Sequence, residues 1–433
     1  MRCEDTMLIE FKVENFRSYK DIVTFSMVAS HDKDFLDNNT ITVSEKMRLL
    51  KTSVIYGANA SGKSNLFKAI AFMKNFVLNS SRESQANEPI EIDRFRLSTA
   101  TDKEPTTFEA IFLIDNTEHR YGFQVYDNKI QNEWLFHKPS IREATLFTRE
   151  EGVFTLGKDF KEGKGKETLT RDNALFLSVV AQFNGEKAKK IIKWFDNIKI
   201  ISGVEDEKYM GFTVSHMDEP EFMEFSKKFL KIADLGIKDI QKIAIPLDRS
   251  YFPKEFPGKL IRKFLTGDDK KFLVEIKTIH QKFDENNEPL SDEYFYLSQN
   301  ESAGTLVFFG LSAFFYDTLK NGRLLIIDEF TAQLHPWLTR AVIEIFHDYK
   351  PPQDNPLQSK AQFIFTAHDA SLMTNQIFRR DQIWFTEKDE YGATDLYSLE
   401  EYKIRKDASF KKDYLMGRYG GVPYINQYIP LFK

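Results

Sequence analysis

Apolar and polar side chains alternate over two stretches near the N-terminus, residues 8–18 and 22–30. This alternation predicts two half-buried strands, because successive side chains of a strand point to opposite faces. We expect them to form a hairpin beside the short apolar run of residues 52–56, which reads as a buried strand. Residues 65–76 then carry Leu66, Ile70, Phe72 and Met73 on one stripe, so a helix follows that strand.

The middle of the chain changes period twice. Four alternating runs separated by turn signals predict an antiparallel meander at residues 107–114, 120–126, 129–136 and 145–149. From 171 to about 243 the period becomes helical, most clearly at 188–195 and 220–233. The stripe in the second segment is best explained by core packing, with a partner-binding face as the alternative; it comprises Phe222, Phe225, Phe229, Leu230 and Ala233.

Residues 251–287 are charged and rich in turn signals, and a strand resumes at 293–297. Helices are then predicted at 307–319, 338–349 and 372–377, and strands at 323–327, 362–366 and 382–386. Such alternation implies a largely parallel sheet covered by helices. The fold class is therefore α/β, a mixed sheet with flanking helices, with an antiparallel β subdomain and an inserted helical subdomain.

Composition narrows the class of protein. The 433 residues suffice for two or three domains, and 42% hydrophobic with 29% charged residues indicates a globular chain. A net charge of −5 gives no global attraction to nucleic acid or anionic membrane. The single cysteine, Cys3, excludes an internal disulfide or zinc ribbon. Without a long apolar run or a signal-peptide pattern, we expect a cytoplasmic protein that does not enter the membrane.

Residues 57–64, GANASGKS, match the phosphate-loop pattern G-x-x-x-x-G-K-[ST] between the predicted strand and helix. Backbone N–H groups of such a loop surround the phosphates of a nucleotide, where the helix dipole also favours anions. Lys63 is predicted to reach the β- and γ-phosphates and the Ser64 hydroxyl to ligate Mg²⁺. We assign nucleotide contacts to Gly57, Asn59, Gly62 and also Asn65; an incidental glycine turn is the alternative.

A second acidic element is needed for hydrolysis. Residues 324–329, LLIIDE, read as a buried parallel strand that ends in two carboxylates, at the sheet edge where α/β proteins bind ligands. Asp328 is predicted to hold Mg²⁺ and Glu329 to activate the attacking water. A strand that merely ends in Asp-Glu is the plain alternative. Together with the phosphate loop, the pair predicts an enzyme that binds and hydrolyses ATP with Mg²⁺.

The long separation of Lys63 from Asp328 resembles ABC-type ATPases, and specifically the branch shared by SMC, RecF and OLD-family proteins. Asn59 is typical of that branch, and residues 16–21, FRSYKD, look like its N-terminal FxS motif. Residues 298–305, SQNESAGT, resemble its signature, although they keep only Ser302 and Gly304 of the usual pattern. Residues 334–336, LHP, and 363–369, FIFTAHD, resemble the segment after the acidic pair and the last strand with its switch histidine, His368.

The resemblance implies roles and a domain layout. His368 would contact the γ-phosphate, and Ser302 and Gly304 would face the nucleotide of a second copy, which implies a homodimer or larger oligomer closed over ATP. Gln124 and Gln131 are two candidates for the Q-loop glutamine, with a surface position equally open. We expect an extension (1–6), an N-terminal ATPase lobe with the meander (7–170), a helical or mixed insertion (171–292), a C-terminal ATPase lobe (293–400) and a tail (401–433).

Within this branch the chain resembles RloA-like ATPases of bacterial restriction and anti-phage loci. Further likenesses are residues 95–98, 121–123, 133–135 and the tail 417–423, whose glycines could also form a simple turn. Such ATPases imply a separate effector, a Toprim-type nuclease or a toxin, because only 65 residues follow His368. Alternatives are a RecF- or SMC-like repair ATPase and a slowly hydrolysing scaffold that holds a toxin inactive; a transporter subunit is disfavoured.

DNA is the natural ligand of this class, but the sequence offers only one candidate contact. A basic run near the C-terminus is interrupted by Asp407 and Asp413, so it reads more readily as a solvated face than as a phosphate-binding patch. The run comprises Lys403, Arg405, Lys406, Lys411, Lys412 and Arg418.

Overall fold

The computed structural model describes residues 6–82, 85, 88–201, 206–233, 236–246, 272–332, 334–348, 360–405 and 408–422. These residues fall into two compact units. Unit 1 holds residues 1–204, 317–332 and 339–433, and unit 2 holds 205–316 and 333–338. Among the described residues, no helix is both long and apolar enough to cross a membrane.

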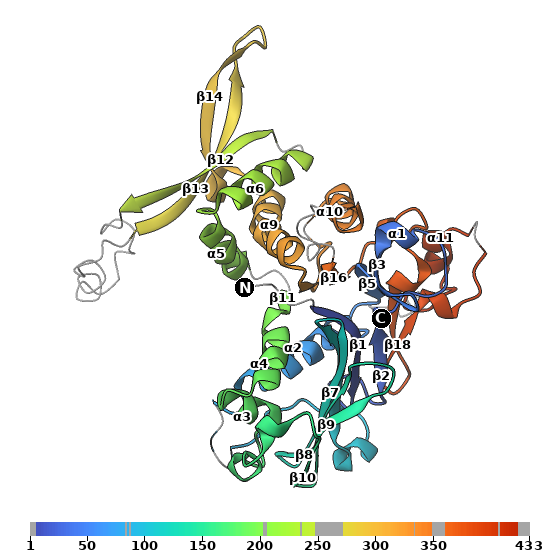
Figure 1. The fold of residues 1–433 in the computed structure, drawn as a ribbon. Coiled ribbons are helices and arrows are strands. Elements are labelled where there is room, and N and C mark those ends of the chain that lie inside the picture. The colour runs from blue at the N-terminus through green and yellow to red at the C-terminus, as the bar shows by residue number, and fades with distance from the viewer. Residues whose placement is uncertain are drawn as a thin grey trace, which may run out of the picture. The chain divides into compact units, whose positions relative to one another are not determined.

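Unit 1 contains a six-stranded sheet in the order β11-β15-β16-β5-β17-β18. Its strands β11, β16, β5 and β18 are labelled in Figure 1. The strands are β11 (Lys199–Ile201), β15 (Leu324–Ile327), β16 (Gln362–Thr366), β5 (Thr52–Gly57), β17 (Ile383–Lys388) and β18 (Thr394–Ser398). All neighbours are parallel except β17 and β18. Parallel strands are buried on both faces, which explains why β15 is wholly apolar and why β16 is apolar between Gln362 and Thr366.

A seven-stranded antiparallel sheet, β10-β9-β8-β7-β6-β1-β2, forms the rest of the β-structure of this unit apart from the hairpin β3 (Thr40–Ser44) and β4 (Met47–Leu50). Its strands are β1 (Thr6–Glu14), β2 (Val23–Ser26), β6 (Thr106–Ile114), β7 (Thr117–Tyr126), β8 (Lys129–Lys138), β9 (Ala144–Glu150) and β10 (Val153–Leu156). The predicted meander is confirmed. The predicted N-terminal hairpin forms as well, but β1 continues this sheet through β6 instead of pairing with β5.

One apolar core joins the two sheets of unit 1. Helix α2 (Lys63–Asn79) contributes Leu66, Phe67, Ile70 and Met73 to the cluster that also holds residues of both sheets. The side chain of Gln362 ties the sheets together, since it accepts from Leu8 N at 2.7 Å and donates to Leu8 O at 3.0 Å. The helix that follows the phosphate loop therefore packs into a core shared by both sheets.

The remaining helices of unit 1 are mostly short: α1 (Leu36–Asn39), α3 (Phe176–Gln182), α4 (Glu186–Asn197) and α11 (Phe410–Leu415). The 3-10 turns η1 (Ala100–Lys103), η2 (Lys161–Gly163), η3 (Glu167–Leu169), η6 (Ala370–Leu372), η7 (Arg380–Gln382) and η8 (Leu399–Glu401) connect the elements. The prediction of a helix at 372–377 is wrong. The chain forms the 3-10 turn η6 at Ala370–Leu372, which Asp369 caps. The tail glycines Gly417, Gly420 and Gly421 have φ of 74°, 65° and 66°, and Gly417 lies in a turn.

Unit 2 combines α5 (Asp206–His216), α6 (Pro220–Ile232), α8 (Leu297–Asn300) and most of α9 (Ala303–Asn321) with a three-stranded sheet. The sheet has the order β12-β13-β14, with β12 (Ile237–Pro246), β13 (Phe272–Phe283) and β14 (Pro289–Tyr296). The stripe of α6 packs inward, and Phe229 stacks on Phe308 at 4.1 Å, which confirms core packing. Helix α10 (Pro336–Asp348) begins in unit 2 and continues in unit 1.

Two predictions for the middle of the chain are wrong. Residues 171–243 are not all helical, because β11 and the start of β12 lie within them. The segment read as turn-rich contains β13, where Val274, Ile276 and Thr278 alternate with Glu275 and Lys277. The charged residues of this segment made the alternation of side chains that is typical of a strand hard to recognise in the sequence. The predicted N-terminal extension lies outside the described residues except for Thr6, which begins β1.

Candidate nucleotide site

The phosphate loop leaves β5, whose six residues are all buried, and enters α2 at Lys63. Two of its residues adopt left-handed backbone conformations, Ala60 with φ 61° and Gly62 with φ 117°. A Cβ atom on Gly62 would lie 2.5 Å from Thr394 Oγ1, so glycine is required there for space as well as for conformation. The loop is thus closely packed against β18.

Lys63 is 5% exposed, and its ammonium donates to Gly57 O at 2.7 Å and to Ala58 O at 2.9 Å. Burial lowers the pKa of Lys63 to about 8, and the negative charges of Asp328 and Glu329 oppose that shift. The lysine and the acidic pair, 265 positions apart in the sequence, are therefore close enough in space to interact electrostatically.

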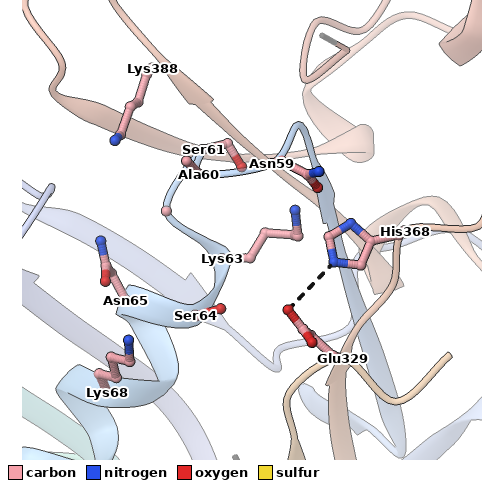
Figure 2. A pocket seen from close by; sticks show the side chains of 11 residues that line it. Asn59, Ala60, Ser61, Lys63, Ser64, Asn65, Lys68, Glu329, His368 and Lys388 are labelled. Carbon is pink, nitrogen blue, oxygen red and sulfur yellow. Dashed lines mark ion pairs between the residues drawn. The ribbon is translucent and has the colours of Figure 1, made fainter. Parts of the chain in front are cut away.

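The acidic pair follows β15 directly. Asp328 is 7% exposed and its Oδ1 accepts a hydrogen bond from Thr366 Oγ1 at 2.7 Å. The same hydroxyl oxygen accepts from Glu329 N at 2.6 Å, so Thr366 joins the two acidic residues. Glu329 has φ 54°, a conformation that non-glycine residues adopt rarely and that costs of order 1 kcal/mol or more. This turn directs the carboxylate of Glu329 into the cleft (Figure 2).

His368 follows β16, the strand between β5 and β15. Its Nε2 lies 3.9 Å from Glu329 Oε1. Burial is the main cause that lowers the pKa of His368, and the charge of Lys63 lowers it further, while Glu329 and Asp328 raise it. The imidazole is therefore predominantly neutral at pH 7, which allows one ring nitrogen to donate and the other to accept a hydrogen bond.

These segments enclose a cleft of about 660 Å³ within unit 1 (Figure 2). That volume falls within the usual range for a small-molecule site. Its lining residues are Asn59, Ala60, Ser61, Gly62, Lys63, Ser64, Asn65, Lys68, Glu329, His368 and Lys388. The structure thus brings together most of the residues that sequence motifs assigned to the site, while the predicted residues Gly57 and Asp328 are not among those that line the cleft.

The FRSYKD segment, residues 16–21, is hydrogen-bonded to the phosphate loop and to the start of α2. Ser18 Oγ accepts from Asn65 Nδ2 at 2.7 Å, and the hydroxyl of Tyr19 donates to Gly62 O at 3.1 Å. On the other flank, Thr386 Oγ1 lies 2.6 Å from Ser61 Oγ, and Thr394 Oγ1 donates to Ser61 O at 2.8 Å. The sequence predicted no role for five residues found here. Thr366 lies within FIFTAHD but received no role, and no motif includes Thr386, Thr394, Lys68 or Lys388.

The predicted signature residues, Ser302 and Gly304, and the two Q-loop candidates, Gln124 and Gln131, do not line the cleft. Ser302 Oγ accepts from Thr305 N at 3.1 Å and so caps α9, with Gly304 in its first turn. Both belong to unit 2, and their contact with a second nucleotide stays a prediction. Gln124 bonds to Thr107 and Asn132 on the seven-stranded sheet, and neither it nor Gln131 lines the cleft. In the predicted basic run, Lys406 and Asp407 lie outside the described residues.

The donor set fits Mg²⁺ brought in with a nucleotide. Ser64 offers a hydroxyl and Asp328 a carboxylate, hard oxygen ligands of the kind that Mg²⁺ prefers. In the described part of the chain, no cluster of three His, Cys, Asp or Glu side chains could hold a metal by itself. Mg²⁺ usually combines one or two protein ligands with phosphate oxygens and water, so this sparse set is suited to a nucleotide-bound ion.

The site defines a P-loop nucleotide-binding protein. It combines a buried strand, a phosphate loop and a helix with a separate strand that ends in acidic residues, and these elements share one cleft. The family model described as "AAA domain, putative AbiEii toxin, Type IV TA system" matches residues 53–374. The chain belongs to this family. The predicted α/β class and the predicted AAA family are confirmed, whereas the ABC-type branch and the RloA-like subgroup stay predictions.

Several solved structures resemble the chain at low identity. An SMC head bound to the C-terminal winged-helix domain of ScpA shares 14% identity, with 90% of this chain and 98% of that chain covered and a TM-score of 0.46. The SMC head domain from Thermotoga maritima shares 12%, with 90% and 98% covered and a TM-score of 0.40. The recombination mediator RecF shares 15%, with 92% and 100% covered and a TM-score of 0.36. No curated protein matches the chain.

Proposed function

We propose that the chain is a Mg²⁺-dependent ATPase. The observation that carries this proposal is the convergence of Lys63, Glu329 and His368, from three separate segments, on one cleft. Loop N–H groups and the ammonium of Lys63 bind the phosphates, which are anionic at neutral pH. Lys63 then exchanges its present bonds to Gly57 O and Ala58 O for phosphate oxygens.

The acidic pair divides two tasks. Asp328, buried and hydrogen-bonded, is suited to hold Mg²⁺ together with Ser64, and the ion would supply charge neutralisation for the departing phosphate. Glu329 faces the cleft and accepts the proton of the attacking water. His368, neutral and 3.9 Å from Glu329, donates from its imidazole to the γ-phosphate.

Glu329→Gln tests this assignment. The amide keeps the shape of the side chain but cannot accept the proton, so kcat should fall about 100-fold or more while ATP affinity is retained. Phosphate release and the Kd for ATP are measured, with Glu390→Gln, an exposed glutamate outside the cleft, as the matched control. Turnover by Glu329→Gln at the wild-type rate would remove Glu329 as the base.

We further propose that this ATPase is the sensor or regulatory subunit of a bacterial anti-phage system and gates a separate effector. Two findings support it: the family description names an AbiEii toxin and a type IV toxin–antitoxin system, and the sequence motifs resemble RloA-like proteins. Co-purification with the product of the neighbouring gene tests this role. A nuclease or toxin partner supports gating, whereas recombination genes as neighbours favour a RecF-like repair ATPase.

Assembly is proposed as well. Ser302 and Gly304 head α9 in the arrangement expected of an anion-binding helix terminus, and we propose that they face the ATP of a second copy. Glu329→Gln should then dimerise on adding ATP, measured by sedimentation, and Ser302→Arg in that background should stay monomeric.

A single-turnover assay separates this enzyme from a scaffold, which would keep its γ-phosphate for the lifetime of the complex.

A further inference from the structure

Lys388 is an exposed lysine at the end of β17 that no motif identified, yet it lines the nucleotide cleft. Figure 2 shows its side chain extending from the strand toward the phosphate loop, near Ala60. In the same view Glu329 and His368 lie on the other side of that loop. The two flanks of the loop therefore carry different chemistry, an acid and an imidazole on one and a cation on the other.

The backbone that carries Lys388 is fixed to the phosphate loop. Lys388 pairs with Thr394 in the β17–β18 ladder, and Thr394 Oγ1 donates to Ser61 O at 2.8 Å. Thr394 N donates to Ser18 O at 2.7 Å, which ties the same position to the FRSYKD segment. Because these contacts hold Thr394, the residue that pairs with Lys388, the backbone of Lys388 is fixed beside the phosphate loop, even though its side chain is exposed.

Charge on the cleft walls also points to a polyanion. Lys63, Lys68 and Lys388 contribute three ammonium groups, whereas Glu329 is the only carboxylate among the described lining residues. Lys68 lies one helical turn beyond Ser64 on α2, so both face the same side of the helix. Three cations against one carboxylate favour a ligand with several negative charges, such as a chain of phosphates.

The orientation of that chain follows from the proposed function, on which this inference rests. The γ-phosphate lies beside Glu329, because the attacking water must reach both. The nucleoside end then extends toward the opposite flank. We propose that Lys388 is a further nucleotide-binding residue that contacts the α-phosphate end of ATP, and that it binds ADP by the same contact.

Equilibrium binding of Mg-ATP and Mg-ADP to Lys388→Ala tests this role. Both affinities should fall by the same factor, about tenfold, as expected for the loss of one charge-assisted contact. Lys388→Arg should restore most of the loss, since the guanidinium keeps the charge. Lys411→Ala is the control, an exposed lysine on α11 that does not line the cleft, and it should bind both nucleotides as the wild type does.

Two results would overturn the inference. Unchanged affinity of Lys388→Ala for both nucleotides would leave Lys388 as a solvated surface lysine. A loss for ATP alone would place Lys388 at the γ-phosphate and reverse the orientation. The first result leaves the proposed ATPase function untouched. The second would move the γ-phosphate away from Glu329 and so also remove Glu329 as the base, whereas ATPase function itself fails only if the wild-type chain does not bind or hydrolyse ATP.

Discussion

Thr366→Val removes a single buried hydroxyl that joins the two acidic residues of the site. Thr366 is fully buried, and its Oγ1 donates to Asp328 at 2.7 Å and accepts from Glu329 N at 2.6 Å. Valine has nearly the same shape, so the change deletes both hydrogen bonds without opening a cavity. Thr366 is thus a positioning residue, since it acts through Asp328 and Glu329.

The magnitude follows from those two bonds. A hydrogen bond to a charged group contributes about 1.5–3 kcal/mol, and a donor left without a partner costs about 1–3 kcal/mol. Because Glu329 N is only partly buried, we expect a total loss of about 2–4 kcal/mol, which lowers the Tm by several degrees. Glu329 is also released from its left-handed conformation, and a misplacement of about 1 Å costs about 100-fold in kcat.

Three variants are compared by calorimetry and by steady-state hydrolysis. Thr366→Ser keeps the hydroxyl and should retain most of the activity. Thr339→Val is the matched control, because Thr339 is fully buried and its hydroxyl has no partner in the described part of the chain. The reasoning is refuted if Thr366→Val hydrolyses ATP at the wild-type rate, or if it loses no more stability than Thr339→Val.

Two further predictions concern the phosphate loop. Gly62→Ala should weaken ATP binding at least about tenfold, because the new Cβ would lie 2.5 Å from Thr394 Oγ1 and the residue has a φ of 117°. Gly152→Ala is the control and should leave binding unchanged, because Gly152 also has a positive φ, 85°, but no atom lies within 4 Å of the new Cβ. The pKa of Lys63 is about 8 in the absence of nucleotide, and a bound phosphate should raise it. Because ATP binds the protonated lysine, whose population falls from pH 8 to pH 9, the affinity for ATP should fall about fivefold over that range. Titration calorimetry checks both, and a pH dependence that persists in Lys63→Arg would assign it to another group.

Contiguous motifs made most of the site predictable from sequence. The eight residues of the phosphate loop and the strand that ends in Asp328 and Glu329 carry their chemistry in local order, so their elements could be placed without a structure. Thr366 escaped assignment because its role depends on register. Ile327 pairs with Phe365, which brings the next residues, Asp328 and Thr366, side by side.

The flank formed by β17 and β18 was unpredictable for the same reason. Thr386 pairs with Gly57, which places its hydroxyl against the phosphate loop, and Thr394 is brought there only by the β17–β18 hairpin. A lone threonine or lysine in a strand carries no signal of its own. Single residues that tertiary pairing delivers to a site are found from the fold, not from spacing along the chain.

The strand order explains why the lysine and the acids can serve one ligand without neutralising each other. β16 lies between β5 and β15, so the strand that leads into the phosphate loop and the strand that ends at the acidic pair are two interstrand spacings apart, about 10 Å. Were the strands adjacent, at about 4.8 Å, Lys63 could pair directly with Asp328 and leave no room for a phosphate. Instead Lys63 donates to Gly57 O and Ala58 O, and Asp328 accepts from Thr366, so neither group is bound directly to the other. Under the proposed function, both therefore stay available to a magnesium nucleotide.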